Sequence, residues 1–219
     1  EKEISEITPI SVEKMGELFK TFENIAKNSH SAKEWIAAEA EISKKTQPFI
    51  SKEERLAMLK ERYGSGQARW NSKLRIVATS IEDIERQVFD ENSNVDILVA
   101  LQASGALQGV WPSVEINGKH FFDGGSFSME NPDVVVDADK MLVLSTGLPV
   151  DVPYKLEDLL AQLEKKGTET SLVLPSEKTM NILKDFNYNT VEAKIRPFVA
   201  QAGREQGQAE AALIKERWL

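Results

Sequence analysis

The chain has 219 residues, and 41% of them are hydrophobic, which is enough for one full-sized core. The net charge of −8 argues against nucleic-acid partners, because nucleic-acid phosphates require a basic protein face. Cysteine is absent, so disulfides, thiol catalysis and cysteine metal ligands are excluded, and a reducing, cytoplasmic location is expected. No apolar run approaches the ~20 residues that span a bilayer, so we expect membrane contact to be peripheral at most.

The first third of the chain predicts three amphipathic helices. Apolar residues recur at three- and four-residue spacing between Ser11 and His30, and capping boxes at Ser31-x-x-Glu34 and Ser51-x-x-Glu54 predict two further helix starts. The bland interpretation of the helical region, residues 11–64, is packing against a core. The alternative is a lid over an acyl pocket or a membrane contact. Lys and Glu are mixed on its polar faces, which makes the membrane contact the weaker option.

A sheet is predicted to begin at Lys73, with a second short strand at Gln87-Val88-Phe89. A helix that begins at Asn94 or Asp96 is apolar nearly all round, which predicts burial. It ends in the small residues Ala103-Ser104-Gly105-Ala106, which let another backbone approach closely. The close approach either makes room for a catalytic turn or only permits tight helix–sheet packing.

A hairpin is the strongest local prediction in the chain. Asn117-Gly118 is the preferred pair for a two-residue turn, because both positions require positive φ. The second strand of the hairpin ends in Asp123-Gly124-Gly125. Asp123 is either a cap of this tight turn or a reactive carboxylate presented beside backbone without side chains.

The C-terminal part predicts strand, helix and strand in succession. Lys140 to Thr146 reads as a fully buried strand, Leu156 to Lys166 as a helix, and Thr170 to Leu174 as a second strand. Such βαβ units predict an α/β fold with a mainly parallel sheet. A short helix from Ser176 and a helical tail with a break near Pro197 are expected to follow.

Several of these residues carry a family resemblance. They are Ala103-Ser104-x-Ala106, Gly109-x-Trp111-Pro112, Asn117-Gly118, Phe122-Asp123-Gly124-Gly125 and Asn131-Pro132. Together they resemble the second half of a patatin-like phospholipase domain, over roughly Leu74 to Leu144. The tail from Asn187 to Leu219 is also similar to small bacterial members. The chain departs from the family pattern at Gln108 and Ser113, where proline is usual.

The resemblance implies a single patatin-like domain over residues 1–219, with a three-layer α/β fold and a mainly parallel central sheet that is incomplete at its N-terminus. Its parts would be the helical insertion at 11–64, the sheet and Asp-Gly-Gly region at 73–146, and C-terminal βα and helical elements at 150–219. Asp123 would be the base of a Ser-Asp catalytic dyad, and Gly124 and Gly125 would form its supporting turn. Burial against neighbouring aromatic residues would raise the pKa of Asp123. The family needs no metal and no cofactor for this chemistry.

The nucleophile of the family lies in G-x-S-x-G, and no serine of this chain fits that motif. Ser65, Ser104 and Ser126 are the candidates, but Tyr63 and Gln102 stand two residues before the first two, and Ser126 lacks the final glycine. We therefore expect the serine and the oxyanion loop in a segment outside these 219 residues, such as a companion N-terminal fragment, and we expect the chain alone to be inactive. Both histidines, His30 and His120, are expected at the surface, which favours a dyad over a triad.

The activity implied by the resemblance is hydrolysis of lipid acyl esters, of the phospholipase A or lysophospholipase kind. The first alternative is a non-catalytic patatin-like protein that binds a lipid or a protein partner. The second alternative is an unrelated α/β binding protein in which Asp123-Gly124-Gly125 is only a turn.

Overall fold

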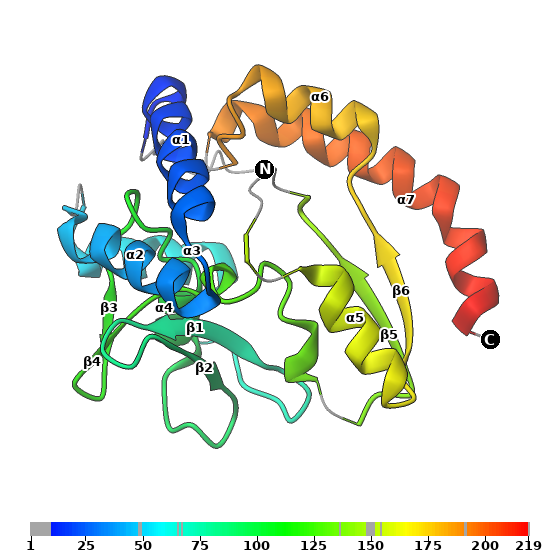
Figure 1. Ribbon diagram of the computed structural model, residues 1–219, viewed down its shortest axis with the longest axis horizontal. Helices are drawn as coiled ribbons and strands as arrows, with labels where there is room; N and C mark the ends of the chain where they lie inside the picture. Colours follow the sequence, from blue (N-terminus) through cyan, green and yellow to red (C-terminus); the bar gives the residue numbers. More distant parts are fainter. Residues whose placement is uncertain are drawn as a thin grey trace. The chain divides into compact units, whose positions relative to one another are not determined.

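The computed structural model describes residues 10–47, 50–64, 66, 68–135, 137–147, 152–153, 155–190 and 192–218. The chain is mixed α/β, as predicted, and its elements are labelled in Figure 1. It divides into two compact units, which we describe separately. The hairpin unit comprises Asn24–Val135 and Val152–Leu156, and the terminal unit comprises Glu1–Glu23, Val136–Asp151 and Glu157–Leu219.

The hairpin unit contains a four-stranded sheet in the order β2-β1-β4-β3, and every neighbouring pair is antiparallel. The strands are β1 (Ile76–Ser80), β2 (Glu85–Phe89), β3 (Val114–Ile116) and β4 (Lys119–Asp123). Asn117 and Gly118 connect β3 to β4 with φ values of 52° and 79°. The predicted hairpin and its two-residue turn are confirmed.

The prediction of a mainly parallel sheet is wrong for the described residues. The connections from β1 to β2 and from β3 to β4 contain only four and two residues, and such short turns join antiparallel strands. Parallel pairing within the described ranges occurs between β5 (Lys140–Leu144) and β6 (Glu169–Val173), which are separated by α5 (Leu156–Lys165). The βαβ prediction therefore holds for this pair and does not extend to the larger sheet.

Three helices of the hairpin unit begin at or beside the predicted caps. They are α2 (Ala32–Lys45), α3 (Lys52–Tyr63) and α4 (Ile97–Ser104). The Ser31 hydroxyl accepts a hydrogen bond from the Glu34 amide, Ser51 and Glu54 form a full capping box, and Asp96 caps α4. The core of this unit forms where α4 packs on β1, β3 and β4, and its buried members include Ile76, Phe89, Leu98, Ala103 and Phe121.

The buried face of α2 carries polar residues among its apolar ones. Trp35, Ile36 and Ala40 are buried, but so are Glu39 and Ser43. In α3 the buried residue is Arg55 rather than one of the leucines. Burial of charged side chains is uncommon unless they have polar partners, so Glu39 and Arg55 are expected to have specific contacts in the core.

The terminal unit contains the beginning of α1 (Val12–Asn28), the β5–β6 pair, α6 (Glu177–Asp185) and α7 (Arg196–Trp218). The predicted break near Pro197 is confirmed, because α7 begins one residue before this proline. The prediction that β5 is fully buried is wrong: burial alternates along the strand, and Leu144 is 69% exposed.

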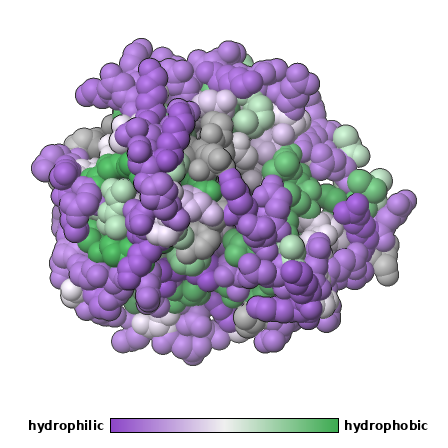
Figure 2. Space-filling view, viewed as in Figure 1, coloured by the Kyte–Doolittle hydropathy of each residue, from purple (hydrophilic) through white to green (hydrophobic). Residues whose placement is uncertain are grey.

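Short 3₁₀ segments complete the described elements: η1 (Gly124–Ser126), η2 (Pro132–Val134) and η3 (Ala193–Ile195). Figure 2 shows a mostly hydrophilic face on which hydrophobic residues appear in separate patches. Within the described ranges, no helix combines the length and the apolarity needed to cross a membrane.

Candidate functional site

Asp123 is the last residue of β4 and the N-cap of η1. Its backbone amide donates a hydrogen bond of 3.2 Å to the carbonyl oxygen of Ala106, just beyond the end of α4. Its own carbonyl oxygen accepts a hydrogen bond of 2.9 Å from the Thr79 hydroxyl on β1. The small residues at the end of α4 therefore allow the close backbone approach that the sequence predicted, and they fix the position of Asp123.

The two glycines after Asp123 have separate structural reasons. A Cβ atom on Gly124 would lie 2.2 Å from the carbonyl oxygen of Val77, so only glycine fits between η1 and β1. Gly125 donates its backbone amide to Asp123 Oδ1 over 2.8 Å. The turn-capping interpretation of Asp123 is thus confirmed. The second carboxylate oxygen, Oδ2, accepts no hydrogen bond from the described residues, so capping leaves one oxygen available for chemistry.

Burial of the Asp123 carboxyl group raises its pKa above the ordinary value. Loss of solvent around the carboxyl raises its pKa to about 6, although the Gly125 amide and the charge of Arg55 act in the opposite direction. The sequence-based expectation of a raised pKa is confirmed. A carboxylate with this pKa is ionised at neutral pH and is a stronger base than an ordinary aspartate.

Arg55 is the positively charged residue that lowers the pKa of Asp123. It is 7% exposed, and its Nη2 donates to the carbonyl oxygens of Gln102 (3.0 Å) and Gly105 (2.9 Å). Its guanidinium carbon lies 4.5 Å from the centre of the Trp111 ring, in cation–π geometry. Burial lowers the pKa of Arg55 to about 10, so the side chain remains charged at neutral pH. Its Nη1 is buried and has no partner among the described residues.

Glu39 brings a second carboxyl group to the same region from α2. The side chain is 3% exposed, and its Oε1 accepts a hydrogen bond from Gln108 Nε2. The same Gln108 nitrogen lies 3.2 Å from Ser126 Oγ, and Trp35 Nε1 donates to the Ser126 carbonyl oxygen over 3.0 Å. Burial raises the pKa of Glu39 well above its usual value, and the negative charge of Asp123 raises it further, against hydrogen bonds from Ser126 and Gln108. The net effect favours the neutral form of Glu39.

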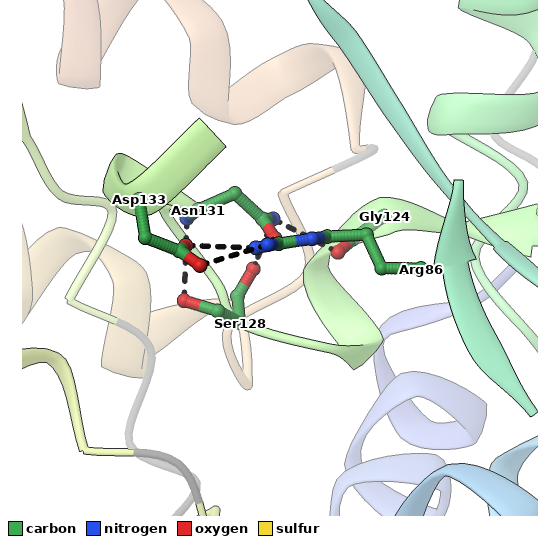
Figure 3. A network of polar contacts seen from close by, with 5 residues as sticks. All are labelled: Arg86, Gly124, Ser128, Asn131 and Asp133. Carbon is green, nitrogen blue, oxygen red and sulfur yellow. Dashed lines mark hydrogen bonds and ion pairs between the residues drawn. The ribbon is translucent and has the colours of Figure 1, made fainter. Parts of the chain in front are cut away.

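A second polar network contacts η1 at the carbonyl oxygen of Gly124 (Figure 3). Arg86 on β2 makes a bidentate ion pair with Asp133, with both N–O distances at 2.7 Å, and donates to Asn131 Oδ1 over 3.1 Å. Asn131 Nδ2 in turn donates to the carbonyl oxygens of Gly124 (3.0 Å) and Ser128. The Asn131-Pro132 segment of the resemblance is thus a support for the Asp-Gly-Gly turn.

None of the other sequence candidates among the described residues is hydrogen-bonded to the Asp123 carboxylate. Ser65 lies outside the described residues. Ser104 is the last residue of α4, and Ser126 is buried and bonded to the groups named above. No hydroxyl group in the described part of the chain donates a hydrogen bond to the Asp123 carboxylate. His30 and His120 are exposed, as predicted, and His120 Nδ1 lies 2.9 Å from Glu82 Oε1.

Sequence reasoning missed Glu39 and Arg55, because apolar periodicity assigns charged residues to the solvent face. A signal for Glu39 was present: it follows Trp35 by four residues, so it shares the buried stripe of α2. Arg55 directly precedes Leu56 and offers no comparable signal.

Within the described ranges, no cluster of three or more His, Asp or Glu side chains is arranged to hold a metal ion. No protein-family model matches the chain, and no curated protein matches it.

Proposed function

We propose that this chain is the larger part of a cytoplasmic, patatin-like hydrolase of lipid acyl esters, of the phospholipase A or lysophospholipase type, with Asp123 as its general base. The observation that carries the proposal is the Asp123 carboxylate: one oxygen is fixed by Gly125, the other accepts no hydrogen bond from the described residues, and its pKa is about 6. In this proposal the complete domain has the three-layer patatin-like fold, and a companion segment supplies the nucleophilic serine and further strands.

The proposed reaction begins when the serine hydroxyl attacks the ester carbonyl carbon and its proton passes to Asp123 Oδ2. The tetrahedral intermediate then expels the alcohol, which takes the proton from Asp123, and an acyl-enzyme remains. Water attacks the acyl-enzyme with Asp123 again as the base, and the fatty acid and the free serine are released. Backbone amides of the companion segment would stabilise the oxyanion.

The alternative function is binding of a lipid or a protein partner without catalysis. It is favoured by the absence of any hydroxyl on the Asp123 carboxylate within the described residues. The two functions differ in whether the complete protein contains a nucleophilic serine.

The test is ester hydrolysis by this chain joined to the segment that carries the proposed serine, with p-nitrophenyl butyrate and a lysophospholipid as substrates. Asp123→Asn should slow both reactions by at least ~100-fold, since loss of a general base typically costs 10²- to 10⁴-fold. Asp83→Asn is the matched control, because Asp83 is an exposed aspartate paired with Lys119.

Activity of the Asp123→Asn protein within a few-fold of wild type would remove Asp123 from the mechanism. A fluorophosphonate probe should label the joined protein and leave the 219-residue chain unlabelled. Absence of both labelling and hydrolysis in the joined protein would support the binding function instead.

A further inference from the structure

Glu39 and Gln108 contact each other, and each leaves one buried oxygen without a partner. Glu39 Oε1 accepts from Gln108 Nε2, whereas Glu39 Oε2 and Gln108 Oε1 have no hydrogen-bond partner among the described residues. The two side chains belong to residues that are 3% and 2% exposed. An ionised carboxylate and an amide oxygen can only accept hydrogen bonds, so with Glu39 ionised neither oxygen could satisfy the other.

A proton on Glu39 would supply the donor that these two oxygens lack. A carboxylic acid and a primary amide form a cyclic pair, in which the amide N–H donates to one carboxyl oxygen and the acid O–H donates to the amide oxygen. Glu39 and Gln108 already make the first of these two bonds. Burial and the nearby negative charge of Asp123 both favour the protonated acid.

The pair is connected to the turn that Asp123 caps. Gln108 Nε2 lies 3.2 Å from the hydroxyl of Ser126, the last residue of η1, and Trp35 holds the Ser126 carbonyl oxygen from α2. Asp123 lies at the other end of this three-residue segment, where Gly125 donates to its carboxylate. A displacement of Ser126 would therefore be transmitted to Gly125 and to Asp123.

The pair also accounts for one departure from the resemblance. Gln108 stands where the patatin-like pattern usually has proline, and proline offers neither a side-chain donor nor a side-chain acceptor. With proline at this position, the buried carboxyl of Glu39 would lose its partner. Glu39 and Gln108 are thus a matched pair in this chain.

We propose that Glu39 is held as a neutral carboxylic acid by Gln108, and that this acid–amide pair is the positioning element that fixes Ser126 and thereby the Asp123 carboxylate. The significance of the pair for catalysis rests on the proposed function. The contacts themselves are independent of it, so they can be tested in the 219-residue chain without substrate.

The first measurement is the ¹³C chemical shift of the Glu39 carboxyl group in the unmodified chain at pH 7. A shift typical of a carboxylic acid is expected, and a shift typical of a carboxylate would overturn the proposal. This measurement needs no substitution, so it decides the protonation state even if every variant fails to fold.

The second measurement is the rate of hydrogen exchange of the Gly125 amide relative to that of the Ile81 amide. The Ile81 amide donates to the carbonyl oxygen of His120 on β4 and serves as the internal reference. Glu39→Gln should keep the ratio within about twofold of wild type, because a side-chain amide can also donate to Gln108 Oε1. The double variant E39L/Q108L makes the site apolar but keeps it filled. Its Gly125 amide should exchange roughly tenfold faster relative to Ile81, as expected when the free energy of about one hydrogen bond no longer stabilises the turn.

The control is Gln102→Leu, which removes another buried glutamine, one whose side-chain amide donates to the carbonyl oxygen of Lys52. This variant should lower overall stability and leave the exchange ratio unchanged. An unchanged ratio in folded E39L/Q108L would show that the pair does not position the turn. Failure of ester hydrolysis would leave all of these outcomes unaffected, so the two proposals can fail separately.

Discussion

The side-chain amide of Asn131 donates a hydrogen bond of 3.0 Å to the carbonyl oxygen of Gly124 (Figure 3). Asn131 adopts a left-handed backbone conformation with φ of 49°, which asparagine tolerates better than most residues. Its orientation is fixed by Arg86, so the ion pair of Arg86 with Asp133 bears on the geometry of the Asp-Gly-Gly turn.

The Arg86 ion pair should depend on the shape of the guanidinium group and not only on its charge. Arg86→Lys retains the charge but loses the bidentate contact with Asp133 and the bond to Asn131. We expect the free energy of unfolding in urea to fall by about 1–3 kcal/mol. Arg69→Lys, at an exposed position, is the control and should change it by less than about 0.5 kcal/mol. Equal effects of the two substitutions would contradict the role of the network.

Gly124 should tolerate no side chain. In Gly124→Ala the new Cβ would meet the Val77 carbonyl oxygen at 2.2 Å, so the backbone of η1 or β1 must move. We expect a loss of about 3 kcal/mol or more, at the upper end for single substitutions. Gly203→Ala in α7 should instead stabilise by about 0.5–1 kcal/mol, because nothing lies within 4 Å of the new Cβ and alanine favours helix. Thermal unfolding of both variants checks the predicted difference in sign.

Asp123 should destabilise the native chain at neutral pH. Its pKa is raised in the folded state, so the native protein binds this proton more tightly than the unfolded chain does. The contribution to stability is complete below the unfolded pKa of about 4 and is lost as the pH rises through about 6. Asp123→Asn should therefore be more stable than wild type at pH 7.5, by about 1–2 kcal/mol for this half-buried group, and about equally stable at pH 3.5.

Asp83→Asn should behave in the opposite way. Hydrogen bonds from Lys119 and Ser80 lower the pKa of Asp83, so its contribution to stability is present above the unfolded pKa and is lost as the pH falls. Urea unfolding of both asparagine variants across pH 3.5–7.5 provides the comparison. A stability profile of Asp123→Asn that parallels wild type over this range would show that the carboxyl is not desolvated.

Arg55 should hold down the proton affinity of Asp123. Arg55→Met retains a long side chain near Trp111 but removes the positive charge. The pKa of Asp123, followed by ¹³C NMR of its carboxyl group, should rise above its wild-type value by up to about one unit. Arg62→Met, at an exposed position on the same helix, should leave it unchanged. A fall in the Asp123 pKa in Arg55→Met would contradict the electrostatic assignment.

The local signals of the sequence predicted local structure well. Ser31, Ser51 and Asp96 cap the helices that follow them, and Asn117-Gly118 forms the turn of its hairpin. These predictions succeed because a cap or a two-residue turn is determined by residues within about four positions of each other.

The pairing of distant strands and the burial of polar groups could not be predicted in the same way. The sequence did not indicate that β1 lies between β2 and β4, because antiparallel and parallel core strands can have the same apolar composition. Nor did it indicate that Glu39 meets Gln108, 69 positions away, since a buried carboxyl is acceptable only when its partner is known. The surroundings of Asp123 are built from such distant contacts, so they were harder to predict than the local helix caps and the hairpin turn.

The hydrogen bond from Trp35 to Ser126 joins residues 91 positions apart. Because long loops close slowly and at an entropic cost, we expect this contact to form late in folding, after the local helices and hairpins. During synthesis, the turn at Asp123 would lack the contacts of Asn131 and Asp133 until the chain beyond Asp133 had left the ribosome. In a variant that retains Trp35 as its only tryptophan, fluorescence in stopped-flow refolding should then report a slower phase than far-ultraviolet circular dichroism does.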